Sequence, residues 1–308
     1  MPTTTAVSFG SPPNELATVR DYVRWAASAF ARAGLLFGHG TDNALDEAFH
    51  LVLWALKLPA DLPTVYLEAT LTAEERAQVW ALLQQRIASR KPAAYLIGEI
   101  QFCGLPFTVD ERVLVPRSPI GELIVQAFRP WLTVEPARIL DLCAGSGCIG
   151  IACAQVFPDA EVDLGELSDG ALEVCEINIL RHRCGGQVRA RKSDLFAGLA
   201  GRRYELIVSN PPYVPEAEVD ALGPEFQHEP RMALAAGIDG MDIVERILNE
   251  APAYLADEGL LVCEIGGSRE EFETRFPDIP VSWPEFEHGG DGVFVLRRAD
   301  LQDWLKGN

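Results

Sequence analysis

Apolar residues recur at three- and four-residue spacing in the first ninety residues of the chain, a pattern that predicts amphipathic helices. The third helix opens on a capping box, Thr72 to Glu75. The three segments are 15–34, 41–57 and 72–90. We therefore expect a small helical domain over residues 1–95. Its predicted core includes Trp25, Trp54 and Trp80.

A second pattern, with a period of two, follows the helical region. Apolar and polar residues alternate around Phe102 to Val115, which predicts a β-hairpin that links the two parts of the chain over residues 96–116. Across 117–308, short apolar runs alternate with helical segments, which is typical of a doubly wound α/β sheet. Strands are expected at 139–142, 162–164, 206–209 and 293–297.

Two consecutive prolines end one of these strands abruptly. The sequence Asn210-Pro211-Pro212-Tyr213 follows the apolar run 206–209. Proline has no N–H and a fixed φ, so the strand stops at a stiff corner whose exposed backbone groups are carbonyl acceptors. With the Asn210 amide and the Tyr213 ring, these acceptors suit a planar amide or amino nitrogen. A plain proline-rich turn would also explain the two prolines alone.

A glycine-rich turn follows the strand at 139–142. Gly145, Gly147 and Gly150 fit the spacing of a nucleotide-binding loop. That signal is weak alone, because a glycine turn can also serve helix packing. Glu166 ends the next apolar run, where a carboxylate can accept hydrogen bonds from two ribose hydroxyls. Together these features indicate a nucleoside-containing cofactor at the strand ends.

The acid at Asp141 indicates which cofactor binds there. A carboxylate four residues before Gly145 would repel a pyrophosphate and attract an ammonium group. S-adenosylmethionine fits this charge, whereas NAD does not. After the expected third strand, Asp194 could accept from an adenine amino group while Leu195 and Phe196 cover the ring. A helix N-cap is the equally weighted alternative for this acid.

The order of these motifs resembles that of class I S-adenosylmethionine-dependent methyltransferases acting on amide or exocyclic amino nitrogens. More narrowly, the chain resembles the protein glutamine N(5)-methyltransferases, which modify peptide-chain release factors or the ribosomal protein uL3. The likeness runs from about Leu45 to Leu301. The stretches that favour the uL3 branch are 113–120, 228–230, 234–237, 239–240 and 286–294. The resemblance thus implies glutamine methylation of uL3, with release factors as the alternative substrates.

The resemblance also implies a mostly parallel sheet with an antiparallel edge strand, a substrate-recognition role for the helical domain, and no metal. It implies catalytic roles for Asn210, Pro211, Pro212 and Tyr213. The implied cofactor-binding residues are Asp141, Ala144, Gly145, Gly147, Glu166, Asp194, Leu195 and Asn210. The implied substrate-binding residues are Asn210, Pro211, Tyr213 and Arg117.

Charge narrows the range of substrates. The chain has 26 Lys and Arg against 45 Asp and Glu, a formal net charge of −19. Through Gly98 the counts are 8 and 9, so the remainder bears nearly all of the excess. A DNA adenine methyltransferase can use the same Asn-Pro-Pro-Tyr corner, but an acidic catalytic part disfavours duplex DNA as the direct substrate. It suits a basic protein partner instead.

Cysteine usage and hydropathy indicate the compartment. The seven cysteines form no paired framework, and Cys148 and Cys153 suit small core positions better than a metal site. No apolar stretch approaches the roughly 20 residues that span a bilayer. The opening residues Met1 to Thr5 lack the regions of a signal peptide. We expect a cytoplasmic enzyme without a membrane partner, and the oligomeric state stays open.

Overall fold

The structure, a computed structural model, describes residues 10–287 and 289–307 and divides into two compact units. The helical unit comprises the described residues through Gly98 together with 223–228, and the sheet unit comprises 99–222 and the residues from 229 onward. The opening residues Met1 to Thr5 and one position of the 286–294 stretch, His288, lie outside the described part of the chain.

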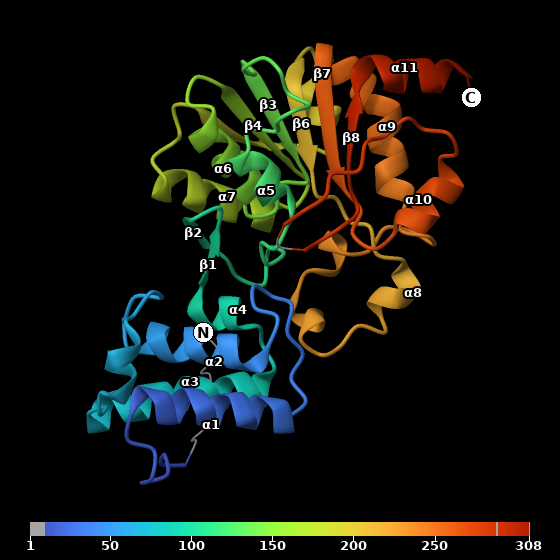
Figure 1. Cartoon of the computed structure of the whole chain (residues 1–308). Helices are drawn as coiled ribbons and strands as arrows, with labels where there is room; N and C mark the ends of the chain where they lie inside the picture. The colour runs from blue at the N-terminus through green and yellow to red at the C-terminus, as the bar shows by residue number, and fades with distance from the viewer. Residues whose placement is uncertain (1–9, 288, 308) are drawn as a thin grey trace. The chain divides into compact units, whose positions relative to one another are not determined.

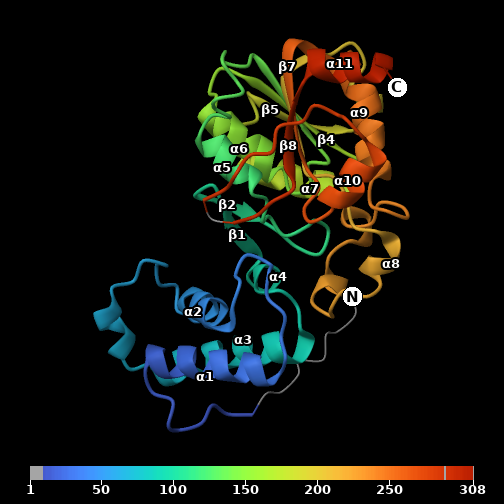
Figure 2. The ribbon, with the colours of Figure 1, turned by 45° about the vertical axis from the view of Figure 1, so that its right-hand side comes forward.

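The helical unit confirms the three predicted helices, which pack against one another (Figure 1; Figure 2). They are α1 (Val19–Arg32), α2 (Ala44–Ala55) and α3 (Ala73–Ser89). The 3-10 helix η1 (Thr64–Glu68) lies between α2 and α3, and a short α4 (Ala93–Ile97) follows α3. The capping box is present, because the Thr72 hydroxyl accepts from the Glu75 N–H and the Glu75 carboxylate accepts from the Thr72 N–H. Local sequence signals are therefore enough to set the start of α3.

Two of the three predicted core tryptophans pack as expected. The rings of Trp25 and Trp80 lie 4.5 Å apart between centroids, and both are partly buried against the core. The prediction for Trp54 is wrong, because its side chain is 43% exposed. The buried face of α2 is formed by residues such as Ala48, Leu51 and Val52, and Trp54 lies to one side of it.

Residues 223–228 join the helical unit through buried charges. Glu225 is fully buried, and its carboxylate accepts from the Leu36 N–H at 3.1 Å and pairs with Arg90 at 2.8 Å. Beside it, the buried Arg86 pairs with Glu47 at 2.7 Å. Breaking a buried pair leaves a charge in a dry environment, so these contacts hold the segment firmly in place.

The sheet unit contains a six-stranded sheet in the order β5–β4–β3–β6–β7–β8. All neighbouring pairs are parallel except β7 and β8, so the predicted α/β class and antiparallel edge strand are confirmed. One isolated bridge, Ser282 to Val295, lies beyond β8. The strands are β3 (Arg138–Leu142), β4 (Glu161–Glu166), β5 (Val188–Lys192), β6 (Tyr204–Ser209), β7 (Leu255–Glu264) and β8 (Val293–Arg297).

Helices cover both faces of this sheet (Figure 1). On one face lie α5 (Ile120–Val125), α6 (Cys148–Val156) and α7 (Asp169–Arg181). On the other lie α9 (Asp242–Tyr254) and α11 (Arg298–Gly307), with α10 (Arg269–Arg275) near them. The short helices are α8 (Glu216–Val219), η2 (Ala197–Leu199) and η4 (Arg231–Ala233), while η3 (Phe226–His228) belongs to the helical unit. Because both faces are covered, four of the five residues of β3 and five of the six residues of β6 are buried, as is typical of parallel strands.

The linking hairpin is shorter than predicted. It consists of β1 (Glu99–Phe102) and β2 (Leu105–Thr108), and it belongs to the sheet unit. The alternation through Val115 marks buried side chains in an extended loop rather than a strand. Helix α5 ends at Val125, and the chain then turns through positive φ at 127 and 128. No helix of the described residues is long and apolar enough to cross a membrane.

Candidate active site

A cavity of about 270 Å³ opens at the carboxyl ends of the parallel strands. In the sheet, β4 and β5 lie on one side of β3, and β6 and β7 lie on the other side, so the direction in which successive strands are added reverses at β3. Such a switch point leaves a crevice between the loops of the two halves, where open α/β sheets bind ligands. The loops after β3, β4, β5 and β6 all line this cavity, so four strand ends meet at one site.

The glycine loop after β3 forms one wall of the cavity. Gly145 lines it with φ at +56°, a conformation that glycine adopts without strain. Gly147 and Gly150 serve packing, because a Cβ at either would approach the Leu164 side chain to 2.8 Å and 2.2 Å. The motif therefore combines one glycine at the cavity with two that let α6 lie close to β4.

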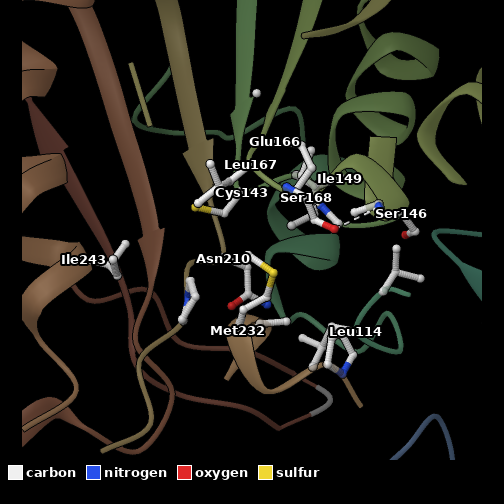
Figure 3. A pocket seen from close by; sticks show the side chains of 18 of the residues that line it. Leu114, Cys143, Ser146, Ile149, Glu166, Leu167, Ser168, Asn210, Met232 and Ile243 are labelled. Carbon is white, nitrogen blue, oxygen red and sulfur yellow. Dashed lines mark hydrogen bonds between the residues drawn. The ribbon is translucent and has the colours of Figure 1, made fainter. Parts of the chain in front are cut away.

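Glu166, at the end of β4, is held by backbone donors (Figure 3). Its carboxylate accepts from the Gly145 N–H at 2.9 Å and from the Ser168 N–H at 2.7 Å, and the side chain is 8% exposed. Each carboxylate oxygen has a second lone pair. The group is thus fixed at the cavity wall and can still accept hydrogen bonds from ligand hydroxyls.

Asp141 lies beneath the glycine loop rather than on the cavity wall. Its carboxyl accepts from the Gly150 N–H at 2.8 Å and is 1% exposed. Burial and the neighbouring Glu166 carboxylate raise its pKa to about 7, against the lowering effect of the Gly150 N–H. A cation bound near these two acids would relieve their repulsion.

The loop after β5 places its acid and its leucine at the cavity. Asp194 and Leu195 both line it, and Leu195 has φ at +47°. Phe196 does not line the cavity, because its ring is fully buried and stacks on Tyr254 at 4.6 Å. The turn is also capped locally, since the Ser193 hydroxyl accepts from the Gly198 N–H at 2.9 Å.

The proline corner after β6 brings two of its four residues to the cavity. Asn210 and Pro212 line it, whereas Pro211 is buried and Tyr213 packs behind the corner. The Tyr213 hydroxyl donates to Glu264 at 3.2 Å. A Cβ on the positive-φ residue Gly266 would approach the Tyr213 ring to 2.7 Å, so this glycine leaves room for the ring.

The opposite wall comes from two distant segments joined by an ion pair. Arg117 lines the cavity and binds the buried carboxylate of Glu229 with both guanidinium nitrogens, at 2.6 and 2.9 Å. Glu229 also accepts from the Val115 N–H at 3.0 Å. Farther along, Val214 pairs with Ala235 in a parallel bridge, which returns the chain beside the corner.

The arginines at the cavity all have carboxylate partners. Arg112 pairs with Asp110 and Glu173, and Arg246 pairs with Asp194 at 2.9 Å. Because these charges are matched, the site offers little to a phosphate. Within the described part of the chain, the hydrogen-bond donors to the Glu166 carboxylate are the backbone N–H groups of Gly145 and Ser168. The site therefore suits a ligand with hydroxyls and a positive charge.

The structure brings eight of the twelve predicted site residues to the cavity wall. These eight are Arg117, Ala144, Gly145, Glu166, Asp194, Leu195, Asn210 and Pro212. The four that do not line it are Asp141, Gly147, Pro211 and Tyr213. Sequence reasoning missed the apolar lining residues, among them Leu114, Ile149, Met232 and Ile243 (Figure 3). Apolar residues at a helix start, such as Ile149 and Ile243, or within an irregular segment carry no sequence signal that separates cavity lining from core packing.

Comparisons with known proteins agree with this geometry. Residues 21–98 match the PrmC N-terminal domain family, and residues 121–237 match the methyltransferase small domain family. A protein of Francisella tularensis, named ribosomal protein uL3 glutamine methyltransferase, is 44% identical over 94% of this chain and 92% of its own. A protein of the same name from Xylella fastidiosa is 49% identical, with the same coverage.

The chain belongs to the ribosomal protein uL3 glutamine methyltransferase family. The resemblance inferred from the motifs is thereby confirmed, and the protein is a methyltransferase. Among solved structures, a methyltransferase from Pyrococcus furiosus is similar, with 18% identity over 63% of this chain and 89% of that one. Its TM-score of 0.47 is too low to bear on the argument.

Proposed function

We propose that this enzyme transfers a methyl group from S-adenosylmethionine to the side-chain amide nitrogen of a glutamine in ribosomal protein uL3. The observation that supports this most strongly is the two relatives of that name, which match over nearly the whole chain. The cavity at the four strand ends is where we place the reaction.

The residues at the glycine-loop end of the cavity fit S-adenosylmethionine. Glu166 offers fixed lone pairs to two ribose hydroxyls, and the buried Asp141 gains from a nearby ammonium or sulfonium charge. Asp194 can accept from the adenine amino group beside Leu195. When bound, S-adenosylmethionine supplies an electrophilic methyl group on a positively charged sulfur. Among residues 10–287 and 289–307, no cluster of three or more His, Cys, Asp or Glu is arranged to hold a metal.

The proline corner supplies what a weak nucleophile needs. An amide nitrogen shares its lone pair with its carbonyl and attacks poorly in water. In our proposal the Asn210 side-chain oxygen and the Pro211 carbonyl accept the two amide hydrogens. They hold the nitrogen in line with the methyl group and stabilise the positive charge that grows on it. Such positioning can contribute on the order of 7–11 kcal/mol at best. The new N–C bond forms as the S–C bond breaks, and the proton then leaves the nitrogen for solvent.

Charge supports a basic protein as the partner. Beyond Gly98 the chain has 18 Lys and Arg against 36 Asp and Glu. This excess would accelerate the encounter with a basic substrate in a salt-dependent manner, and it opposes binding of duplex DNA. We assign substrate recognition to the helical unit and the activity to the cytoplasm, where ribosomal proteins are made.

Mass spectrometry of cells that lack this gene tests the proposal. We expect uL3 from these cells to be lighter by one methyl group at a single glutamine, and release factors to be unchanged. A methyl group missing from a release factor instead would move the assignment to that substrate. Intact methylation of both proteins would refute the proposal. A low-salt gel shift with duplex DNA should show no tight complex.

A further inference from the structure

The chain that follows the proline corner is held by a second segment, residues 234–240, which contains two of the stretches that favour the uL3 branch. The Val214 N–H donates to the Leu234 carbonyl at 2.8 Å, and the Glu216 N–H donates to the Gly237 carbonyl at 2.9 Å. Because two backbone hydrogen bonds join them, the segment and the end of the corner lie side by side. The position of this segment therefore bears on the position of the corner.

The two pieces of chain approach each other closely at Gly240, in the turn that ends the segment. A Cβ on Gly240 would lie 2.1 Å from the Tyr213 carbonyl oxygen, and the φ of Gly240 is +80°. A larger residue here would push the Tyr213 backbone away. The fixed φ of Pro212 leaves few torsions between Tyr213 and the Pro211 carbonyl, so a displacement of Tyr213 would also move that carbonyl.

An arginine from a helix farther along the chain holds this turn. Arg275, at the end of α10, donates from Nη1 to both carboxylate oxygens of Asp239, at 2.7 and 2.9 Å. The same guanidinium pairs with two acids in the first turn of α9, Asp242 at 3.0 Å and Glu245 at 2.7 Å. Because Asp239 directly precedes Gly240, the ion pair fixes the part of the turn that contacts the corner.

The charges of this cluster make it depend on the arginine. The Arg275 side chain is 28% exposed, and three carboxylates share its one positive charge. A single exposed ion pair contributes little to stability, whereas a network of several charges can contribute more. Without the arginine, three like charges would face one another, and their repulsion would favour an open turn.

We infer that Arg275 is a positioning residue for the methyl acceptor, because through Asp239 it holds the Gly240 turn against the proline corner. This inference rests on the proposed function, since the corner is where we place the substrate amide. Arg275 does not line the cavity, so it acts only through the backbone that it holds. In-line methyl transfer is sensitive to such a displacement, since a misplacement of about 1 Å can cost on the order of 10²-fold in rate.

Two substitutions and their combination test whether Arg275 acts through Asp239. The measurement is kcat with saturating purified uL3. We expect Arg275→Ala to lower kcat about tenfold, and Asp239→Asn, which keeps the shape but loses the charge, to lower it about fivefold. If both substitutions break the same link, the combined variant should lose about tenfold. Independent effects would multiply to about fiftyfold.

Cofactor affinity separates this role from general damage to the site. Helix α9 begins beside the cluster and carries the cavity residue Ile243, but its apolar face is buried in the core and holds the helix in place. We therefore expect the dissociation constant for S-adenosylmethionine to stay within about twofold of wild type in every variant. Arg269→Ala is the matched control on the same helix. Arg269 is exposed and pairs with Glu273 at 2.8 Å, and its loss should change neither quantity.

Three results would overturn the inference. They are an unchanged kcat in Arg275→Ala, a loss of cofactor affinity as large as the loss of kcat, and a combined variant whose loss equals the product of the single losses. If Arg275→Ala fails to fold, Arg275→Lys keeps the charge on one nitrogen in place of the planar guanidinium and must lower kcat about threefold. A wild-type enzyme that leaves uL3 unmethylated would instead refute the proposed function, so the two failures are distinguishable.

Discussion

The two ends of the cavity are built in different ways. At the cofactor end, the carboxyl groups of Asp141 and Glu166 are held by backbone N–H groups of residues 2, 9 and 21 positions away in the sequence. At the methyl-acceptor end, the Glu264 carboxylate is held by the side-chain hydroxyls of Ser118 and Tyr213, which come from two segments far apart in the chain. A backbone donor is present whatever the side chain, whereas a side-chain donor is lost with one substitution. The cofactor end should therefore tolerate changes in its neighbours better than the acceptor end does.

Removing the carboxylate at the cofactor end should weaken cofactor binding without slowing the bound enzyme. Hydrogen bonds to a charged group contribute about 1.5–3 kcal/mol. We expect Glu166→Ala to raise the dissociation constant for S-adenosylmethionine roughly 30- to 150-fold, which corresponds to about 2–3 kcal/mol. Isothermal titration measures this change, and kcat at saturating cofactor should stay close to that of wild type. Glu161→Ala, at the exposed start of the same strand, is the control. A loss of kcat with unchanged affinity would contradict this role.

The buried acid Asp141, at the cofactor end of the cavity, should make the binding of S-adenosylmethionine depend on pH. Because the pKa of Asp141 is raised to about 7, the free protein holds a proton there that a cationic ligand would displace. Affinity should fall about tenfold between pH 8 and pH 6, since one proton must leave. The Asp141→Asn variant lacks the titrating group, so its affinity for S-adenosylmethionine should change little between pH 8 and pH 6. A profile equally steep in the variant would assign the proton to another group.

The raised pKa of Asp141 also makes the stability of the fold depend on pH. Stability should fall as pH rises, whereas cofactor affinity should increase. In the unfolded chain Asp141 ionises near its ordinary pKa of 3.8, whereas in the fold the raised pKa keeps the proton on it up to about pH 7. Between these values the folded state binds more protons, so the contribution of Asp141 to the free energy of unfolding falls as pH rises. Urea denaturation of wild type and Asp141→Asn at pH 5 and pH 8 measures the difference.

A glycine behind the corner allows a smaller perturbation of the acceptor end. Gly266→Ala would bring a Cβ within 2.7 Å of the Tyr213 ring at a positive φ of 52°. Gly201→Ala is the matched control, because its φ is +78° but nothing lies within 4 Å of the added Cβ. Both should lose about 1–2 kcal/mol of stability from backbone strain. Only Gly266→Ala should also lower kcat, about fivefold, since it displaces the corner. Equal kcat values in the two variants would show that the Tyr213 position does not matter.

The two ends of the cavity also differ in how far the sequence alone predicts them. The cofactor end lies in contiguous motifs with known backbone geometry, so the sequence alone predicts that Gly145, Glu166 and Asp194 line the site. The alternation of strands and helices predicts the α/β class, and the antiparallel edge strand follows from the resemblance, but the strand order is known only from the structure. Glu264 is one acid at the end of a buried strand, and only the folded chain brings it to Ser118 and Tyr213. The extended loop after β2 and the burial of Glu225 in the helical unit likewise depend on contacts distant in sequence.

We propose above all that Asn210 holds a glutamine amide of uL3 for methylation. Purified uL3 incubated with S-adenosylmethionine and either wild-type enzyme or Asn210→Ala, followed by tandem mass spectrometry, tests it most directly. We expect wild type to add 14 Da, roughly the mass of one CH₂ unit, to a single glutamine. Asn210→Ala should be slower on the order of 10²–10³-fold while still binding the cofactor. Methylation at a residue other than glutamine, or an equal rate in the variant, would contradict the account.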